Sequence, residues 1–342
     1  MKRLALSVLS LICLCVESAS ILRGAGSTFA GPLYAKWSDG FRAETNNSIE
    51  FGAVGSGEGV RRMEAGSVDF GASDEPLTPA ELEEKGLRQY PVAMGGIVPV
   101  VNLPGIGSGK LKLNADVLGK IYLGHIQRWR DPAILSINPE LAAIMPDLPI
   151  TPVRRNESSG STFVFSYYLN ALSPEWRAGP GAGKQLRGVA GVAADGPKGV
   201  VGLLKSKAGA IAYIDFLRAQ QASLSMAQLP GHFGYYMSPS PDSIRAAARF
   251  VAEKSVFGRN QDFYMILTNS GTYDGWPMAM ATFVVLPAKR SDSVMRTLEF
   301  LSWSFKHGDG AANELGYVPL PDLLKVGVRR AWSHTYGFKM AS

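Results

Sequence analysis

Short apolar runs rich in β-branched residues alternate with helical patterns in this chain, and this alternation constrains its fold most. Three such runs occupy residues 48–54, 68–74 and 89–102, and a segment with helical patterning follows each of them. Alternating strands and helices predict βα units and an α/β fold. No repeat with a period of roughly 20 to 50 residues and no low-complexity tract occurs, so we expect neither a solenoid nor a long disordered linker.

Apolar residues also mark the later parts of the core. Residues 280–288 predict a buried strand that could complete a first lobe after the chain has built a second, and a length of 342 residues suits two lobes. Two stripes with helical spacing predict core-facing helices. The stripes are Tyr34, Trp37 and Phe41, and Val294, Leu298, Leu301 and Phe305.

Residues 1–20 have the pattern of a secretory signal peptide, with a basic start, an apolar stretch and small residues at 18–20. The apolar stretch stops at Glu17 and is shorter than the roughly 18 residues that a membrane-spanning helix needs. A lipoprotein anchor is disfavoured because large residues precede Cys13 and Cys15. Both cysteines leave with the signal, so we expect an exported, periplasmic protein without disulfides or thiol chemistry.

Glycine and hydroxyl residues come together at three predicted strand-to-helix turns, at 24–29 (GAGSTF), 53–59 (AVGSGEG) and 154–162 (RRNESSGST). Glycine gives backbone freedom there, and Ser or Thr could act simply as an N-cap. A helix N-terminus also presents free N–H groups and the positive end of the helix dipole, which together bind anions. Three such turns, with an arginine beside one of them, favour an anion site over capping alone.

Three charged residues predict the kind of anion. The guanidinium of Arg155 can hold two oxygens of a tetrahedral oxyanion while Glu157 orients it, although the two could form an ordinary surface pair. Asp74 follows a predicted strand, where α/β sheets collect ligand residues, but it could also be a turn residue ahead of Pro76. A carboxylate in an anion site suits only a ligand that carries a proton, as hydrogen phosphate does and sulfate at neutral pH does not.

Other functional classes lack their signatures. The net charge of +6 is too small, and basic runs with interleaved aromatics are too few, to indicate a nucleic-acid partner. The loop at 179–185 (GPGAGKQ) departs from a phosphate loop at both ends, and no Gly-x-Ser-x-Gly elbow occurs. The four histidines lack the spacing of paired metal ligands. A secreted phosphatase and a binding protein for another oxyanion remain as rival hypotheses.

Seven motifs, in order, resemble those of the periplasmic phosphate-binding proteins of bacterial phosphate ABC transporters. The resemblance runs from about residue 24 to about residue 335. It implies a two-lobed α/β fold, each lobe a central sheet flanked by helices, with residues 21–97 and 279–342 in the first lobe and 98–278 in the second. Two crossovers would form the hinge, and dehydrated phosphate would lie between the lobes. The motifs are GAGSTFAGPLYAKW, GSGEGV, VDFGASDEPL, YLGHIQRW, VRRNESSGSTFVF, GAIAYIDF and YVPLPD.

The resemblance also implies the residues of the site. Asp74 matches the proton acceptor, and Glu157 matches the acid that orients the binding arginine. Three residues depart from the family pattern, since Ser161 stands where threonine is usual, Ser158 where glycine is common and Glu157 where aspartate is common. We expect these departures to change the affinity and not the ligand. The implied phosphate ligands are Thr28, Phe29, Ser56, Asp74, Arg155, Ser159, Gly160 and Ser161.

Together the motifs and the resemblance predict a monomeric phosphate-binding protein without catalytic activity, cofactor or metal. Such a protein would deliver phosphate to an inner-membrane ABC permease and its ATPase.

Overall fold

The computed structural model describes residues 21–257 and 262–339, and only the backbone within residues 251–257. The signal peptide predicted for residues 1–20 lies outside these ranges. Within the described ranges, no helix is both long and apolar enough to cross a bilayer.

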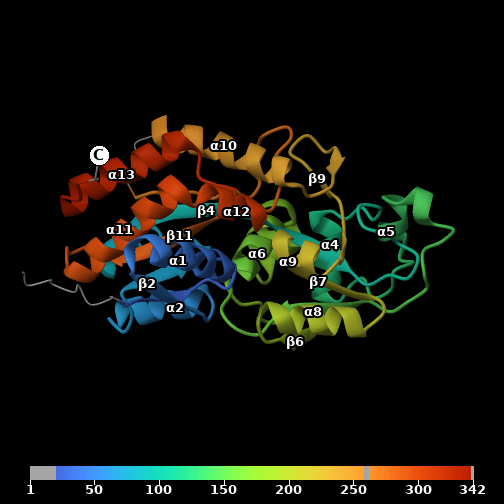
Figure 1. The fold of residues 1–342 in the computed structure, drawn as a ribbon. Helices are drawn as coiled ribbons and strands as arrows, with labels where there is room; N and C mark the ends of the chain where they lie inside the picture. Colours follow the sequence, from blue (N-terminus) through green and yellow to red (C-terminus); the bar gives the residue numbers. More distant parts are fainter. Residues whose placement is uncertain (1–20, 258–261, 340–342) are drawn as a thin grey trace, which may run out of the picture.

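A mixed sheet of ten strands forms the centre of the molecule (Figure 1). Parallel pairs join β1 to β2 and β3, and β5 to β6 and β7, whereas β4 and β11 run antiparallel to their neighbours. The predicted α/β class and the four predicted strands, which become β2, β3, β4 and β11, are confirmed. The main strands, in sheet order, are β2 (Ser48–Ala53), β1 (Ile21–Gly26), β3 (Phe70–Ser73), β11 (Ala279–Pro287), β4 (Leu87–Val101), β7 (Ala210–Asp215), β5 (Thr151–Arg155) and β6 (Val192–Ala194).

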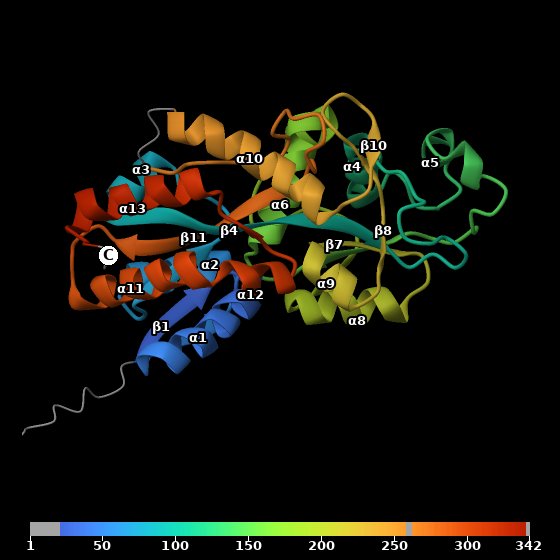
Figure 2. The ribbon, with the colours of Figure 1, turned by 45° about the horizontal axis from the view of Figure 1, so that its top comes forward.

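Strand β4 belongs to both halves of the molecule. Residues Leu87 to Gly96 pair with β11, and Ile97 to Val101 pair with β7. The two short strands β12 (Val318–Pro319) and β8 (Ser225–Met226) also pair with β4, one in each part. A hairpin of β9 (Leu229–Pro230) and β10 (Tyr236–Met237) lies apart from the sheet. Figure 2 shows β4 running from the half that holds β1 and β11 into the half that holds β7.

Helices cover both faces of the half that holds β1 and β11, which is called the first half below. Helix α10 (Pro241–Phe257) packs with α13 (Asp322–Tyr336) on one side of β4 and β11, while α1 (Gly31–Thr45) and α11 (Asp292–His307) lie on the other (Figures 1 and 2). Both predicted apolar stripes are buried, in α1 and α11. The other helices are α2 (Ser56–Glu64), α3 (Pro79–Glu84), α4 (Ala115–Leu123), α5 (Pro132–Ser136), a 3-10 turn (Pro139–Leu141), α6 (Gly160–Leu172), α7 (Pro174–Ala178), α8 (Gly196–Ser206), α9 (Phe216–Gln221) and α12 (Asp309–Glu314).

Candidate anion-binding site

The turns that follow β1, β2 and β3 meet at one edge of the sheet. The N–H of Gly55 donates to the carbonyl of Gly26 at 2.8 Å, and the N–H of Ser27 donates to the carbonyl of Ala72 at 2.9 Å. Gly26 has φ +146°, and a Cβ on it would lie 2.0 Å from the Ala72 oxygen, so only glycine fits. The carboxyl ends of parallel strands share one edge, and this geometry explains why three turns distant in sequence converge here.

The hydroxyl residues at these turns do not cap the helices that follow them. The N-caps of α1 and α2 are Ala30 and Gly55, and neither makes a side-chain capping bond. Ser159 is the N-cap of α6, yet its buried Oγ has no hydrogen-bond partner among the described residues. Ser56 turns its Oγ to Asp74 and accepts from the Asp74 N–H at 3.2 Å. N-capping therefore does not explain Ser56 and Ser159, whereas Ser27 Oγ both accepts from the Ala30 N–H at 3.2 Å and donates to Asp74.

Asp74 is buried, with a relative exposure of 3%, immediately after β3. Its Oδ2 accepts from Ser27 Oγ at 2.7 Å and from Ser56 Oγ at 3.5 Å. Its Oδ1 has no partner among the residues that the structure describes. Burial raises the pKa of Asp74 to about 6, and the neighbouring hydroxyls of Ser27 and Thr282 oppose that rise. Thr282 Oγ1 is itself buried without a hydrogen-bond partner among the described residues, so it does not bond Oδ1. One carboxylate oxygen thus remains for a ligand that can donate a proton.

Arg155, at the end of β5, is also buried, with a side-chain exposure of 3%. Its Nε donates to Glu157 Oε1 at 2.7 Å, its Nη2 bonds the same oxygen, and Nη2 also donates to Thr28 Oγ1 at 3.4 Å. Although burial opposes it, the hydrogen bond and charge of Arg155 lower the pKa of Glu157. The second oxygen, Oε2, accepts from the N–H of Gly196 at 3.2 Å. The pair is therefore no exposed surface contact. Glu157, whose side chain is longer than the aspartate common at this position in the family, still reaches Arg155.

The start of α6 lies directly against the first half of the molecule. A Cβ added to Gly160 would lie 2.4 Å from Asp74 Cβ and 2.7 Å from Ser56 Oγ. A Cβ on Gly57 would lie 2.2 Å from Ser158 Oγ. The structure therefore represents a closed arrangement in which the N-terminus of α6 faces Asp74.

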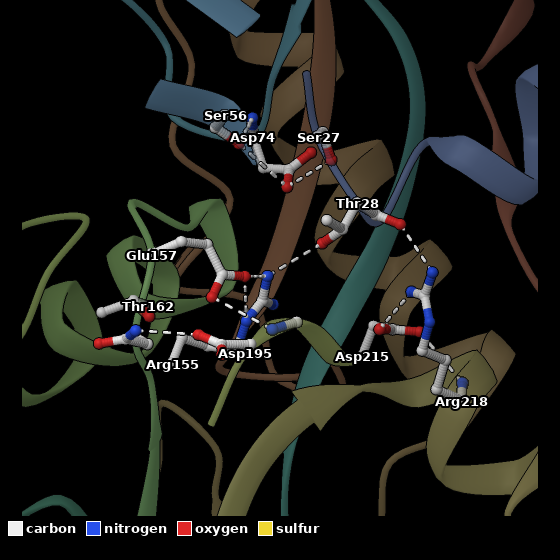
Figure 3. Close-up of polar contacts among 12 residues, drawn as sticks. Ser27, Thr28, Ser56, Asp74, Arg155, Glu157, Thr162, Asp195, Asp215 and Arg218 are labelled. Carbon is white, nitrogen blue, oxygen red and sulfur yellow. Dashed lines mark hydrogen bonds and ion pairs between the residues drawn. The ribbon is translucent and has the colours of Figure 1, made fainter. Parts of the chain in front are cut away.

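The structure brings the sequence-predicted residues together. Ser159, Gly160 and Ser161 are buried at the start of α6. Phe29 packs its ring on Tyr317 with a centroid distance of 4.7 Å, and the Tyr317 hydroxyl donates to the Phe29 carbonyl at 2.5 Å. Figure 3 shows Thr28 between Arg155 and Arg218, with Ser27 and Asp74 beside it.

Sequence reasoning missed three residues of this region. Ser27, which holds Asp74, was present in the first turn but was not singled out. Asp215 ends β7 and is buried at 2% exposure, and it forms an ion pair of 2.7 Å with Arg218 on α9. The Nη2 of Arg218 donates to the Thr28 carbonyl at 2.7 Å. The position of Asp215 after a strand is the same signal that pointed to Asp74, whereas the contact of Arg218 spans 190 positions of sequence and left no local signal.

Comparison with known proteins places this site in a family. A protein-family model described as a PBP superfamily domain matches residues 16–287. The phosphate-binding protein PstS of Xylella fastidiosa strain Temecula1 is 38% identical over 317 residues, which are 92% of this chain and 85% of that protein. PstS of Haemophilus influenzae is 37% identical over 337 residues, covering 97% and 98%.

A solved structure gives the same fold. The ABC-type phosphate transport receptor of Vibrio cholerae superposes with a TM-score of 0.57 at 16% identity, covering 87% of this chain and 99% of that one. The fold, the converging turns and the two close relatives agree. The chain belongs to the PBP superfamily and, within it, to the PstS family of phosphate-binding proteins.

Proposed function

We propose that the protein binds inorganic phosphate between its two lobes, as the substrate-binding component of a phosphate ABC importer. The buried Asp74 carboxylate carries this proposal, because its Oδ1 has no partner in the described part of the chain. A fully ionised anion would set two acceptors against each other there, whereas hydrogen phosphate donates the missing proton. The names of the PstS relatives support the same ligand.

The remaining groups would hold the other phosphate oxygens. Arg155 supplies positive charge from a side chain that Glu157 has already oriented, so little conformational freedom is lost on binding. The N-terminus of α6 supplies N–H donors and the positive end of a helix of 13 residues. The full proposed ligand set is Thr28, Phe29, Ser56, Asp74, Arg155, Ser159, Gly160 and Ser161.

We propose a hinge at the point where β4 changes partner. The N–H of Ile97 donates to the Met278 carbonyl at 2.9 Å, so the two predicted crossovers at 97–98 and 278–279 lie side by side. Helix α10 falls within the stretch 98–278 that the sequence assigns to the second lobe, yet it packs with α13, β4, β11 and β12. We therefore place α10 with the first lobe and propose that the second crossover lies near residue 240 and not at 278–279, so that Met278 supports the hinge from within the first lobe.

The proposed role is transport without catalysis, in the periplasm, with residues 1–20 as the export signal. The partners would be an inner-membrane permease and its ATPase, and the protein would act as a monomer. A chromogenic phosphate ester incubated with the protein and divalent metal ions should therefore stay intact. Hydrolysis that Arg155→Ala abolishes would favour a phosphatase instead.

Calorimetry of the protein without residues 1–20 tests the proposal. Phosphate and arsenate are both protonated tetrahedral anions near neutral pH and should both bind, whereas sulfate should not. Sulfate binding equal to that of phosphate would contradict the proposed role of Asp74. If neither phosphate nor arsenate binds, the proposed function is rejected.

A further inference from the structure

Arg218 reaches from one half of the molecule to the other. It lies on α9, and its Nη2 donates to the Thr28 carbonyl, 2.7 Å away, in the turn between β1 and α1 (Figure 3). Its Nη1 is held by Asp215 Oδ2 at 2.7 Å, and Asp215 Oδ1 accepts from the N–H of Arg218 at 3.0 Å. The guanidinium is thus fixed on its own helix and directed at Thr28.

The hydrogen bond to Thr28 acts on the next amide as well. In a trans peptide the C=O bond of Thr28 and the N–H bond of Phe29 lie in one plane and point in opposite directions. A donor that fixes the carbonyl therefore turns the Phe29 N–H to the opposite side, away from Arg218. The positive charge on Arg218 also polarises this peptide and strengthens its N–H as a donor.

The neighbouring peptides of the turn are fixed in the same way. The Phe29 carbonyl accepts from Tyr317 at 2.5 Å, and the Ala30 N–H donates to Ser27 Oγ at 3.2 Å. Both of these contacts lie within the first half, so they are present whether or not the halves close. The contact from Arg218 is different because its donor and acceptor lie on different halves.

We propose that Arg218 is a positioning residue that orients the Phe29 amide toward the bound anion only when the lobes close, and so couples closure to binding. This inference rests on the proposed phosphate-binding function. Asp215 holds Arg218 ready for that contact. The bonds between the halves would then retain phosphate once it has entered, which affects its release more than its capture.

A neutral pair of substitutions tests this role without leaving Asp215 as an unpaired buried charge. The variant Asp215→Asn/Arg218→Ala keeps an oxygen that can cap α9, because asparagine is as good an N-cap as aspartate. We expect its dissociation constant for phosphate, from calorimetry, to rise on the order of 10- to 100-fold, as for the loss of a hydrogen bond to a charged group. Most of the change should appear in the dissociation rate measured by stopped flow.

The matched control is the pair Asp242→Asn/Arg245→Ala at the start of α10. Arg245 donates to Asp242 at 2.6 Å with the same spacing of three residues, and this contact lies within one helix. We expect its phosphate affinity to match that of the wild type. A second comparison, Lys184→Ala, removes an ion pair to Glu75 of 2.5 Å that joins the two halves away from Thr28. It should change the affinity less than about threefold, as for a partly exposed pair.

Two further readouts separate positioning from a purely structural role. The Phe29 amide proton should shift in the NMR spectrum of the phosphate-saturated variant, while the melting temperature of the ligand-free variant stays within about 2 °C of wild type. Arg218→Lys, which keeps the charge but loses the planar fork, should give an intermediate affinity.

If Asp215→Asn/Arg218→Ala binds and releases phosphate as the wild type does, the inference is overturned while the proposed function stays intact. An affinity loss in Lys184→Ala as large as in the neutral pair would also overturn it, because closure in general would then explain the effect. Failure of the wild type to bind phosphate would instead reject the proposed function and this inference with it.

Discussion

The two oxygens of Asp74 have different surroundings. Oδ2 accepts from Ser27 and Ser56, whereas Oδ1 is buried without a partner among the described residues. A buried polar atom without a partner costs about 1 to 3 kcal/mol, so a ligand that donates to it regains this energy. Selectivity at this position would therefore come from the proton on the ligand and not from its net charge.

Asp74→Asn should narrow the preference for phosphate over sulfate. The amide can accept from a protonated ligand oxygen or donate to a bare one, so phosphate keeps appreciable affinity while sulfate binding becomes measurable. Competition titrations at about pH 7.5 and fixed ionic strength measure the ratio, since weak anion binding depends on salt. A ratio that does not fall in Asp74→Asn would show that discrimination lies in the donors around the site.

The pKa of Asp74 also predicts how stability depends on pH. Burial raises this pKa from an ordinary value near 4 to about 6, so between these pH values the folded protein binds more protons than the unfolded chain. The free energy of unfolding should therefore fall as pH rises from about 4 to about 6. Ligand-free Asp74→Asn avoids this loss and should be more stable than wild type at pH 7.5, by up to about 3 kcal/mol, and equally stable at pH 4.

Urea unfolding across this pH range measures the difference. Asp147→Asn, at an exposed surface residue, serves as the control substitution. If Asp74→Asn raises the free energy of unfolding equally at pH 4 and at pH 7.5, the Asp74 carboxylate does not titrate with a raised pKa.

Helix α6 supplies a test at the scale of elements. The methyl of Gly160→Ala would lie 2.4 Å from Asp74 Cβ, so the lobes could not close fully. We expect phosphate affinity to fall by roughly 5- to 150-fold, as for overpacking worth about 1 to 3 kcal/mol. The ligand-free melting temperature should not fall, because a slight opening of the cleft relieves this contact and alanine favours the helix.

Gly202→Ala in α8 is the matched control for this substitution. No atom lies within 4 Å of the Cβ that it would add, so phosphate affinity should stay unchanged. A loss of affinity in Gly202→Ala, or none in Gly160→Ala, would contradict a close approach of α6 to Asp74 in the bound state.

Local sequence patterns predicted elements well and contacts between elements poorly. The runs at 48–54 and 89–102 became β2 and β4, because strand patterning and turn residues act within a few positions. The turns that bear Thr28 and Ser159 were recognised because glycine and hydroxyl residues mark them. Arg218 was missed because it acts on a carbonyl 190 positions away, and no local pattern records such a partner. The packing of α10 is a tertiary property of the same kind.

The whole molecule should change shape when phosphate binds. The proposed ligands come from both lobes, with Asp74 on the first and Arg155 on the second, and the proposed hinge lies where β4 changes partner and where the chain returns near residue 240. Small-angle scattering should therefore show a smaller radius of gyration with phosphate and no change with sulfate. Equal radii with and without phosphate, at saturation, would argue against hinge closure while leaving binding intact.

A crystal structure of the phosphate complex tests the central claim most directly. We predict that Asp74 Oδ1 lies about 2.5 to 2.7 Å from one phosphate oxygen, as in a short hydrogen bond from a protonated oxygen to a carboxylate. The guanidinium of Arg155 and the first N–H groups of α6 should contact the other oxygens. Phosphate bound elsewhere, or a complex in which every phosphate oxygen lies more than about 3.5 Å from Asp74 Oδ1, would contradict the claim that Asp74 reads the proton of the ligand.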